Sequence, residues 1–452
     1  MKGSLSKTKL LLAFSCALTV MAFTFKDAPQ QSVALAIAPP PSTTQEVVDA
    51  ANAFKVTLTT AQIATVYLDY SFANAIKWSN LPQALSRNRV GIAFSALSAT
   101  QLTAAKALIR VASGATNSEG YAEIEGLLAA DDYLGANGGG TDYSAGNYYL
   151  ALLGTPALTG TWELQFGGHH LAVANTYKNG NLVGATPSFR AVEPFASFTS
   201  GGATYQPIVQ ERDAFAAIYA GLTATQRTSA TLSGSFGDLV LTPGKDWQFP
   251  TTKSGLVCSS LDATQKALVL AAIKTYVDDI DTANARTIMT KYTNEINQTY
   301  VGFVGTGDMV TRGDYMRIDG PSVWIEYSAQ GGIVIRNATH PHSVWRDRTS
   351  DYGGTGNPSS VKNVDAAVYK MASTPNPTSG LTTLTFSLPQ DMTIKIAIYD
   401  INGRMVKAVT KGKMLSGENS VSADLNNLAS GVYTYTLENE NGERAAKRLV
   451  KN

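Results

Sequence analysis

Residues 323–335, VWIEYSAQGGIVI, carry the pattern that decides how the centre of the chain folds. The first five residues alternate between a wholly apolar face and a face that carries Trp324 and Glu326. Gln330–Gly332 then supplies a turn, and a second apolar run follows at Ile333–Ile335. Alternation with a period of two is typical of a β-strand. The stretch therefore predicts a strand, a turn and a further extended run.

A short phrase recurs where we expect helices to begin. It reads Leu, then Ser, Thr or Asp, then two residues and a Gln, and it starts at Leu58, Leu97, Leu222 and Leu261. In such a capping box the side-chain oxygen accepts a bond from a backbone N–H three residues on, and the Gln reaches back. We interpret the phrase as helix punctuation rather than as a repeat array. These helices occur together with predicted strands, one of which covers residues 162–166. The combination predicts an α+β large domain over residues 44–353.

The first 22 residues have the features of a secretory signal peptide. Lys2, Lys7 and Lys9 precede an apolar run over residues 10–22, which ends in small residues that suit cleavage. The run is shorter than the about 20 residues that a membrane-spanning helix needs. We therefore expect residues 1–22 to be removed and the mature chain to have no transmembrane segment.

The charge balance argues against one class of function, and the cysteine content excludes an internal disulfide. The chain has 36 Lys and Arg against 35 Asp and Glu, and no basic stripe with interleaved aromatic residues. Nucleic-acid binding is therefore not expected. Beyond the signal peptide Cys258 is the one cysteine, so the mature chain has no internal disulfide.

Two stretches divide the mature chain. Residues 23–43 contain three consecutive prolines, and residues 354–372 are rich in Gly, Asn, Pro and Ser, so we expect both to be linkers. In residues 373–452, period-two alternation recurs, and Asn-Gly pairs at 402–403 and 441–442 predict tight turns. About seven short strands fit a small all-β, immunoglobulin-like sandwich.

The small domain carries a specific set of motifs in order. They are PNP at 375–377, YDINGR at 399–404, LASGVY at 428–433 and KRLVK at 447–451. This set resembles the type A C-terminal sorting domain of type IX secretion cargo. The resemblance implies that residues 373–452 engage the type IX secretion machinery of a Bacteroidota-type cell, and that the protein is secreted or held at the outer cell surface. The alternative is an ordinary adhesive sandwich.

The four histidines of the chain occur as two pairs. His169 and His170 follow Gly167–Gly168, and His340 and His342 flank a proline. On an extended segment residues i and i+2 project from the same face, so the second pair could present two imidazoles to one metal ion. Adjacent residues point to opposite faces, so on a regular strand only one residue of the first pair could join them. The preceding glycines could permit a bulge that changes this.

Three imidazoles with an open position would suit Zn, Cu or Fe. Carboxylates that could serve as further ligands or as partners of the ligands are Glu163, Glu326, Asp347 and Asp351. The opposing hypothesis is that the histidines are buried hydrogen-bonding residues and that Arg346 and Asp347 form a structural ion pair.

Two functions from different classes follow. The first is a secreted metal-dependent enzyme in which the metal activates water or oxygen and Glu326 or Asp347 accepts the proton. The second is a non-catalytic surface protein that binds a metal ion or an extracellular ligand, with Tyr143, Tyr148 and Trp345 lining its site. A Gly-rich loop at 131–147 could line a binding cleft or be a plain surface loop.

The large domain also resembles a known family. The motifs that match are YYLALLGTP at 148–156, GGHHL at 167–171, HxHxxWRDxxxDYG at 340–353, WSNLP at 78–82 and GPSVWIE at 320–326. They resemble the bacterial family named domain of unknown function 3500. The resemblance implies a largely secreted family and supplies neither a reaction nor a ligand.

Overall fold

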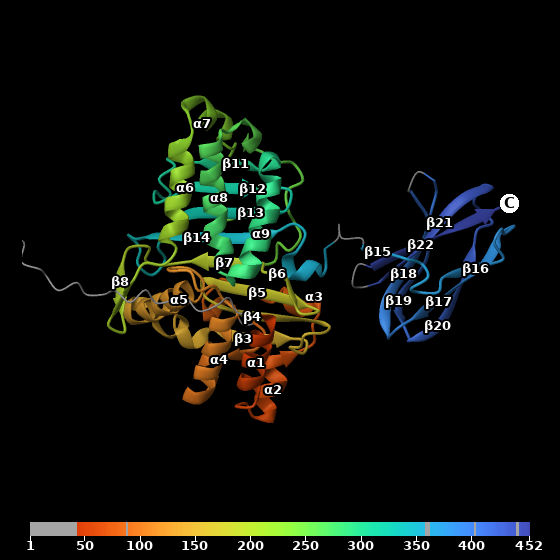
Figure 1. Ribbon diagram of the computed structural model, residues 1–452, viewed down its shortest axis with the longest axis horizontal. Coiled ribbons are helices and arrows are strands. Elements are labelled where there is room, and N and C mark those ends of the chain that lie inside the picture. Colours follow the sequence, from red (N-terminus) through yellow and green to blue (C-terminus); the bar gives the residue numbers. More distant parts are fainter. Residues whose placement is uncertain (1–42, 87–88, 358–361, 402–403, 440–442) are drawn as a thin grey trace, which may run out of the picture. The chain divides into compact units, whose positions relative to one another are not determined.

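The computed structural model describes residues 43–86, 89–357, 362–401, 404–439 and 443–452 (Figure 1). The expected signal peptide, the first linker up to residue 42 and the two expected Asn-Gly turns lie wholly or partly outside the described residues. No helix within these ranges is long and apolar enough to cross a membrane.

Helices in the large domain begin at the capping signals that the sequence predicts. At Thr59, Ser98, Thr223 and Asp262 the side chain and the Gln three residues on bond each other's backbone N–H, which confirms the four capping boxes. The helices are α1 (Thr44–Lys55), α2 (Thr60–Val66), α3 (Phe72–Ala75), α4 (Ala99–Val111), α5 (Tyr121–Leu134), α6 (Val209–Gly221), α7 (Ala224–Ala230), α8 (Ala263–Val277) and α9 (Thr282–Glu295).

A twelve-stranded sheet is the framework of the described large domain, in the order β1-β3-β4-β5-β7-β14-β13-β12-β11-β10, with β2 on β3 and β6 on β5. Its first seven strands are β1 (Tyr67–Leu68), β2 (Ile92–Ala93), β3 (Tyr149–Leu153), β4 (Thr161–Gly168), β5 (Leu171–Lys178), β6 (Asn181–Gly184) and β7 (Ser188–Ala191). The others are β10 (Leu256–Val257), β11 (Tyr300–Val304), β12 (Tyr315–Asp319), β13 (Val323–Gly331) and β14 (Thr339–Asp347). A separate hairpin consists of β8 (Phe198–Ser200) and β9 (Ala203–Tyr205).

The two halves of the large domain repeat one plan, and the sheet joins them at β7 and β14. The first half adds β5, β4 and β3 outward from β7, and the second adds β13, β12 and β11 outward from β14. The side chains of Gln62 and Gln101 bond each other across 39 residues of sequence, as do those of Gln226 and Gln265. The recurring phrase therefore also marks an internal repeat, which corrects its interpretation as punctuation alone.

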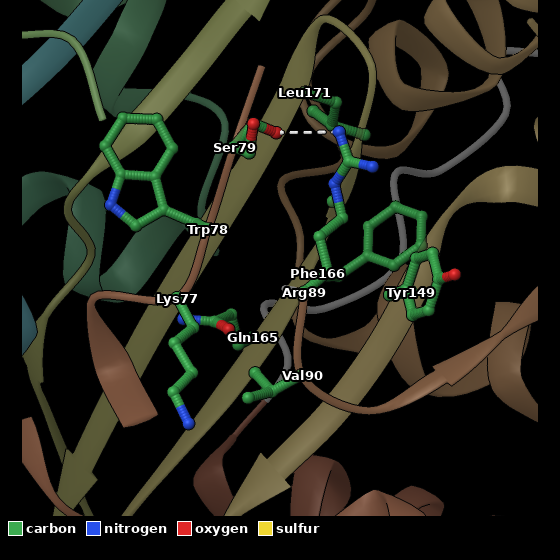
Figure 2. Close-up of a pocket in the computed structure, with 10 residues that line it drawn as sticks. Lys77, Trp78, Ser79, Arg89, Val90, Tyr149, Gln165, Phe166 and Leu171 are labelled. Atoms are coloured by element: carbon green, nitrogen blue, oxygen red, sulfur yellow. Dashed lines mark hydrogen bonds between the residues drawn. The ribbon is translucent and has the colours of Figure 1, made fainter. Parts of the chain in front are cut away.

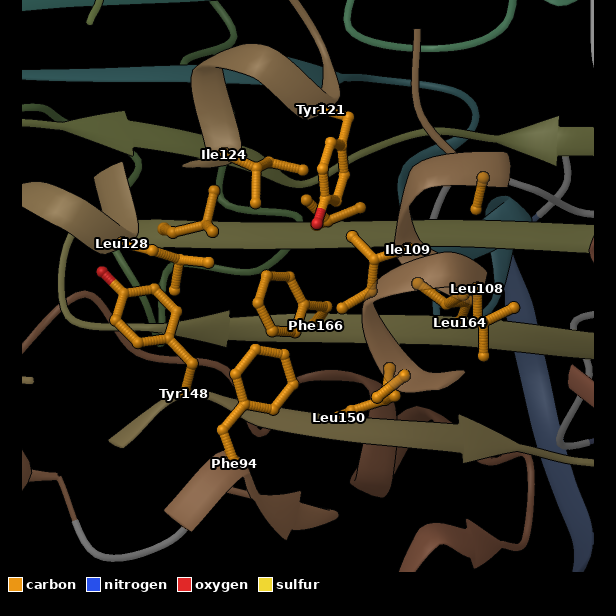
Figure 3. Packing of buried hydrophobic residues seen from close by; sticks show 14 of the residues in the cluster. Phe94, Leu108, Ile109, Tyr121, Ile124, Leu128, Tyr148, Leu150, Leu164 and Phe166 are labelled. Atoms are coloured by element: carbon orange, nitrogen blue, oxygen red, sulfur yellow. The ribbon is translucent and has the colours of Figure 1, made fainter. Parts of the chain in front are cut away.

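Each half has its own apolar core between helices and sheet. In the first core α4 and α5 pack on β3 and β4, and Figure 3 shows Ile109 and Ile124 turned toward Phe166 and Leu150. In the second core α6, α8 and α9 pack on β11 to β14 (Figure 1). A third cluster, which contains Phe189, covers the opposite face of β7 and β14. The centre of the sheet is thus buried on both faces.

The hairpin expected at 323–335 forms differently from the prediction. The first strand, β13, runs on to Gly331, but residues 332–338 form turns, and the second strand, β14, begins only at Thr339. Ile333 is 67% exposed, so the apolar run at Ile333–Ile335 is a loop and not a strand. The prediction failed because a short apolar run has no periodicity that separates strand from loop.

The C-terminal region is all-β, as the alternation predicts. Its strands are β15 (Lys362–Val364), β16 (Ala372–Thr374), β17 (Leu381–Leu388), β18 (Met392–Tyr399), β19 (Met405–Met414), β20 (Gly417–Asp424), β21 (Gly431–Asn439) and β22 (Glu443–Lys451). They form a five-stranded sheet, β15-β22-β21-β18-β19, and a three-stranded sheet, β16-β17-β20. These pairings are antiparallel except that of β15 with β22. Tyr369 and Met371, from the expected linker, are buried in the core of this region.

Candidate metal centre

The β4–β5 hairpin places the first histidine pair in a tight turn. Gly168 ends β4 and Leu171 begins β5, so His169 and His170 alone connect the two strands. His170 has φ +65°, a left-handed conformation that is uncommon outside glycine. A Cβ at Gly168 would lie 2.7 Å from the ring of Tyr148, so the turn requires glycine there. The rule that adjacent strand residues point apart does not apply, because neither histidine is in a strand.

Strand β14 places the second histidine pair on one face of the sheet. His342 pairs with Ala191 of β7, and His340 pairs with Gln330 of β13. The Nε2 atoms of His340 and His342 lie 3.0 Å apart. The spacing of two residues along an extended strand therefore brings the two imidazoles together, as the sequence suggested.

Three imidazole nitrogens converge at this point. The Nε2 atom of His170 lies 2.8 Å from that of His340, and ligand atoms of His170, His340 and His342 lie within 4.8 Å of one another. Two nitrogens that bind one zinc ion at about 2.0–2.1 Å in tetrahedral geometry are separated by roughly 3.3 Å. The three nitrogens are therefore close enough to one another to serve as ligands of one ion.

Carboxylates face the outer nitrogens of two of these rings. Nδ1 of His342 lies 2.9 Å from Oδ1 of Asp238, and Nδ1 of His340 lies 3.8 Å from Oε2 of Glu193. Burial tends to raise the pKa of Asp238, but the hydrogen bond and charge of His342 outweigh burial and lower it. Because neutral imidazole has one N–H, a proton on Nδ1 leaves Nε2 with a free lone pair.

Burial keeps the rings in the uncharged form that binds metals. His170 is 3% exposed and His340 is 4% exposed. The pKa of His170 and that of His340 both lie well below the usual value, first because burial penalises the charged form and then because of the neighbouring histidines. Both rings are therefore neutral at pH 7, and their lone pairs are available to a cation.

His169 is not grouped with His340 and His342, but it forms an overlapping group of possible metal ligands with His170 and Asp131. Its Nδ1 lies 2.6 Å from Oδ1 of Asp131 on α5, and its ring stacks on His170 with 3.4 Å between ring centroids. Tyr143 meets the ring of His169 edge-on at 4.9 Å, and the hydroxyl of Tyr148 donates to the backbone carbonyl of His169. Asp131, which the sequence placed in a loop, belongs to a helix and orients the turn.

Glu326 has hydrogen-bond partners other than the histidines. Its carboxylate accepts bonds from the backbone N–H of Val240 and Leu241, at 2.6 and 2.9 Å. It also accepts bonds from the hydroxyl of Tyr315 and the indole N–H of Trp324, both at 2.7 Å. Four donors occupy the carboxylate, and Glu326 is in none of the groups of clustered ligand atoms around the histidines.

Asp347 also has hydrogen-bond partners other than the histidines. It accepts bonds from Lys291 at 3.0 Å and from the hydroxyl of Tyr292 at 2.7 Å. Arg346 does not pair with Asp347, as one hypothesis held, but with Asp351 at 2.7 Å. Consecutive strand residues point to opposite faces, which explains why Arg346 and Asp347 have different partners.

Glu163 and Trp345, which the sequence also suggested for the site, have partners away from the three rings. Glu163 is fully buried and accepts a bond from the hydroxyl of Thr176 at 2.9 Å, and burial raises its pKa to about 8. The indole N–H of Trp345 donates to the hydroxyl of Tyr292 at 3.1 Å, in the core on the helical side of the sheet. Of the proposed aromatic lining, Tyr143 and Tyr148 reach the first histidine pair and Trp345 does not.

A small pocket lies beside the histidine hairpin. Gly167 and Leu171, on either side of the turn, are among the residues that line it. Figure 2 shows Arg89 of the lining, which donates to the backbone carbonyl of Ser79 at 3.3 Å. The pocket holds about 10 Å³, which is room for about one water molecule. The backbone N–H of His170 also bonds the carbonyl of Asn80 at 3.3 Å, so this segment covers the turn.

Comparison with known families agrees with both resemblances seen in the sequence. Residues 41–354 match the family model described as protein of unknown function, DUF3500. Residues 374–452 match the model of the secretion system C-terminal sorting domain, which indicates type IX secretion to the cell surface or the extracellular space. A search of curated proteins gives no match. The chain therefore belongs to the DUF3500 family, and a secretion system C-terminal sorting domain follows its family domain.

Proposed function

We propose that the large domain of this exported protein binds one transition-metal ion through Nε2 of His170, His340 and His342. The observation that carries the proposal is the convergence of three imidazole nitrogens within 4.8 Å, on two buried histidines and one half-buried histidine. Where Nδ1 is protonated, Nε2 lone pairs face one another at 2.8 and 3.0 Å, and such lone pairs repel unless a cation or a proton lies between them. A metal ion satisfies all three at once.

The donor set favours Zn, Cu or Fe, since imidazole suits these borderline ions. Three protein ligands leave a coordination position open, which is typical of catalytic rather than structural sites. A metal in such a site supplies Lewis acidity toward bound water, or redox chemistry toward oxygen. In the enzyme hypothesis His342 is oriented by Asp238, and Asp131 holds His169 against His170. Glu326 and Asp347 receive no proton-transfer role, because other donors already occupy them.

Metal capture without turnover is the second candidate. The observation in its favour is the burial of His170 and His340, which are 3% and 4% exposed, because an ion bound between them would have little contact with solvent. The two functions differ in their effects on test reactions. An enzyme would hydrolyse an activated ester or phosphoester, or consume oxygen in the presence of a reductant, and would lose this activity with the histidines. A capture protein would bind metal with no turnover.

The export route completes the proposal. We infer that residues 1–22 direct the chain across the inner membrane, and that residues 373–452 fold as an immunoglobulin-like sandwich that the type IX machinery recognises. Two β-sheets around one apolar core, with nearly all pairings antiparallel, support the sandwich.

Metal content measured by mass spectrometry tests the binding proposal. We expect close to one ion per chain after exposure to Zn, Cu or Fe, and loss of that ion in His340→Ala/His342→Ala. Arg336→Ala/Asn337→Ala is a matched control, because both residues are exposed in the loop before β14. Thermal unfolding shows whether each variant is folded. A wild-type chain that retains no metal would refute the proposal.

A further inference from the structure

A second group of ligand atoms lies apart from the histidines, on the helical side of the sheet. Glu119 precedes α5, Glu123 is in its first turn, and Glu211 is in the first turn of α6. They are 6%, 2% and 1% exposed, and one oxygen from each lies within 4.8 Å of the others. Three buried carboxylates so close together need a source of positive charge.

The surrounding side chains do not supply enough positive charge. Arg190 of β7 bonds Oε2 of Glu123 at 3.0 Å and pairs with Asp279 at 2.9 Å. The amide nitrogen of Gln210 donates to Oε2 of Glu119 at 3.1 Å. One guanidinium therefore serves Glu123 and a further buried acid, and the group keeps a surplus of negative charge.

Glu211 shows most directly that the group lacks positive charge. Among the described residues neither of its carboxylate oxygens has a hydrogen-bond partner, although the side chain is 1% exposed and lies against Glu119 and Glu123. Buried carboxylates normally have partners. Burial and then the neighbouring acids raise the pKa of Glu119 to about 10, and burial followed by the charge of Asp279 raises the pKa of Glu123 to about 8. Either protons or a cation must neutralise the group.

We propose that Glu119, Glu123 and Glu211 bind one hard divalent cation, with Ca²⁺ as the expected occupant. The donors are all oxygen, which suits Ca²⁺ and disfavours the ions that prefer imidazole. Two oxygens that bind Ca²⁺ at about 2.3–2.6 Å are at most about 5 Å apart, which agrees with the observed group.

The position of the group gives the ion a structural role. Glu123 is in α5, which packs in the core of the first half, and Glu211 is in α6, which packs in the core of the second half. Asp279, from the turn between α8 and α9, accepts a bond from the backbone N–H of Gly120 at 2.8 Å. A cation here ties the two halves of the large domain together. Because Arg190 and Ala191 are consecutive strand residues, Arg190 points to the opposite face of the sheet from His342, which pairs with Ala191.

Calcium binding to the full chain tests this inference. After removal of metals with a chelator, we expect calorimetric titration with CaCl₂ to give about one site per chain, with a Kd of about 10⁻³ M or tighter, as in extracellular modules. We also expect millimolar Ca²⁺ to raise the Tm. Glu211→Gln should abolish both effects, and Glu125→Gln, an exposed change on the same helix, should leave them unchanged.

Two outcomes would overturn the inference. One is a wild-type chain that neither binds Ca²⁺ nor gains Tm from it. The other is a Glu211→Gln chain whose Tm exceeds that of the wild type by the same amount in chelator and in Ca²⁺. This result would show that protons neutralise the group. The His340→Ala/His342→Ala chain should keep the Ca²⁺ response, so this site and the histidine centre are tested separately.

Discussion

Nε2 of His170 lies 2.8 Å from Nε2 of His340, although 170 residues of sequence separate them. The contact exists because β5 and β14 both pair with β7. The tight turn before β5 and the first residues of β14 therefore lie next to each other. The candidate metal centre therefore lies where the two halves of the sheet meet, and it takes histidines from both halves.

Asp238→Asn is expected to weaken metal binding. Asp238 orients His342 through a 2.9 Å bond, and loss of such a supporting carboxylate typically lowers metal affinity about 10- to 100-fold. Its side chain is 41% exposed, so the change should have little effect on folding. Competition with a chromogenic chelator measures the affinity, and Asp213→Asn, at a more exposed acid, is the control. An affinity equal to that of the wild type would show that Asp238 does not position the ligand.

Glu326→Gln separates a structural role from a catalytic one. The amide would present an N–H₂ group to two of the four donors, because two donate to each carboxylate oxygen, and each buried group left without a partner costs about 1–3 kcal/mol. We expect a clear fall in the free energy of unfolding, measured by urea denaturation, with unchanged metal content in the folded fraction. Unchanged stability together with lost turnover would instead support the catalytic assignment.

Gly168→Ala should disturb the histidine turn. The added Cβ would lie 2.7 Å from the ring of Tyr148, and overpacking of this kind costs about 1–3 kcal/mol. Because the ring lies under the turn, we expect both lower Tm and weaker metal binding. Gly237→Ala is the control, because its Cβ would meet nothing within 4 Å. Equal Tm values for the two variants would contradict this packing argument.

Glu163 should make stability depend on pH. Burial raises its pKa in the folded chain to about 8, from an ordinary value of 4.5, so folding favours the protonated form. This contribution is fully present below pH 4.5 and is lost as pH rises through about 8. Glu163→Gln should therefore be more stable relative to the wild type at pH 9 than at pH 5, as measured by urea denaturation. A difference in stability that is the same at both pH values would refute this.

Much of the framework was predictable from local patterns. Period-two alternation located β4, β13 and the C-terminal strands, and the capping boxes located four helix starts, because both signals arise within a few residues of sequence. The pairing of His340 with His342 followed from strand geometry alone. The sorting domain was evident from its motifs.

The rest depended on contacts between distant segments. Asp131, Glu193 and Asp238 approach the histidines from a helix and two loops, and no spacing in the sequence relates them to His170. The rule that adjacent strand residues point to opposite faces did not apply to His169 and His170, because they form a turn in which His170 is left-handed. The loop at Ile333 has the composition of a strand, and only the register of β13 with β14 shows otherwise.

Anomalous X-ray diffraction from crystals of the zinc-loaded full chain is the most direct test of the metal centre. We expect one strong peak about 2.0–2.1 Å from Nε2 of His170, His340 and His342, and no such peak in His340→Ala/His342→Ala. No peak at these nitrogens, in crystals of a chain that has taken up zinc in solution, would contradict this expectation.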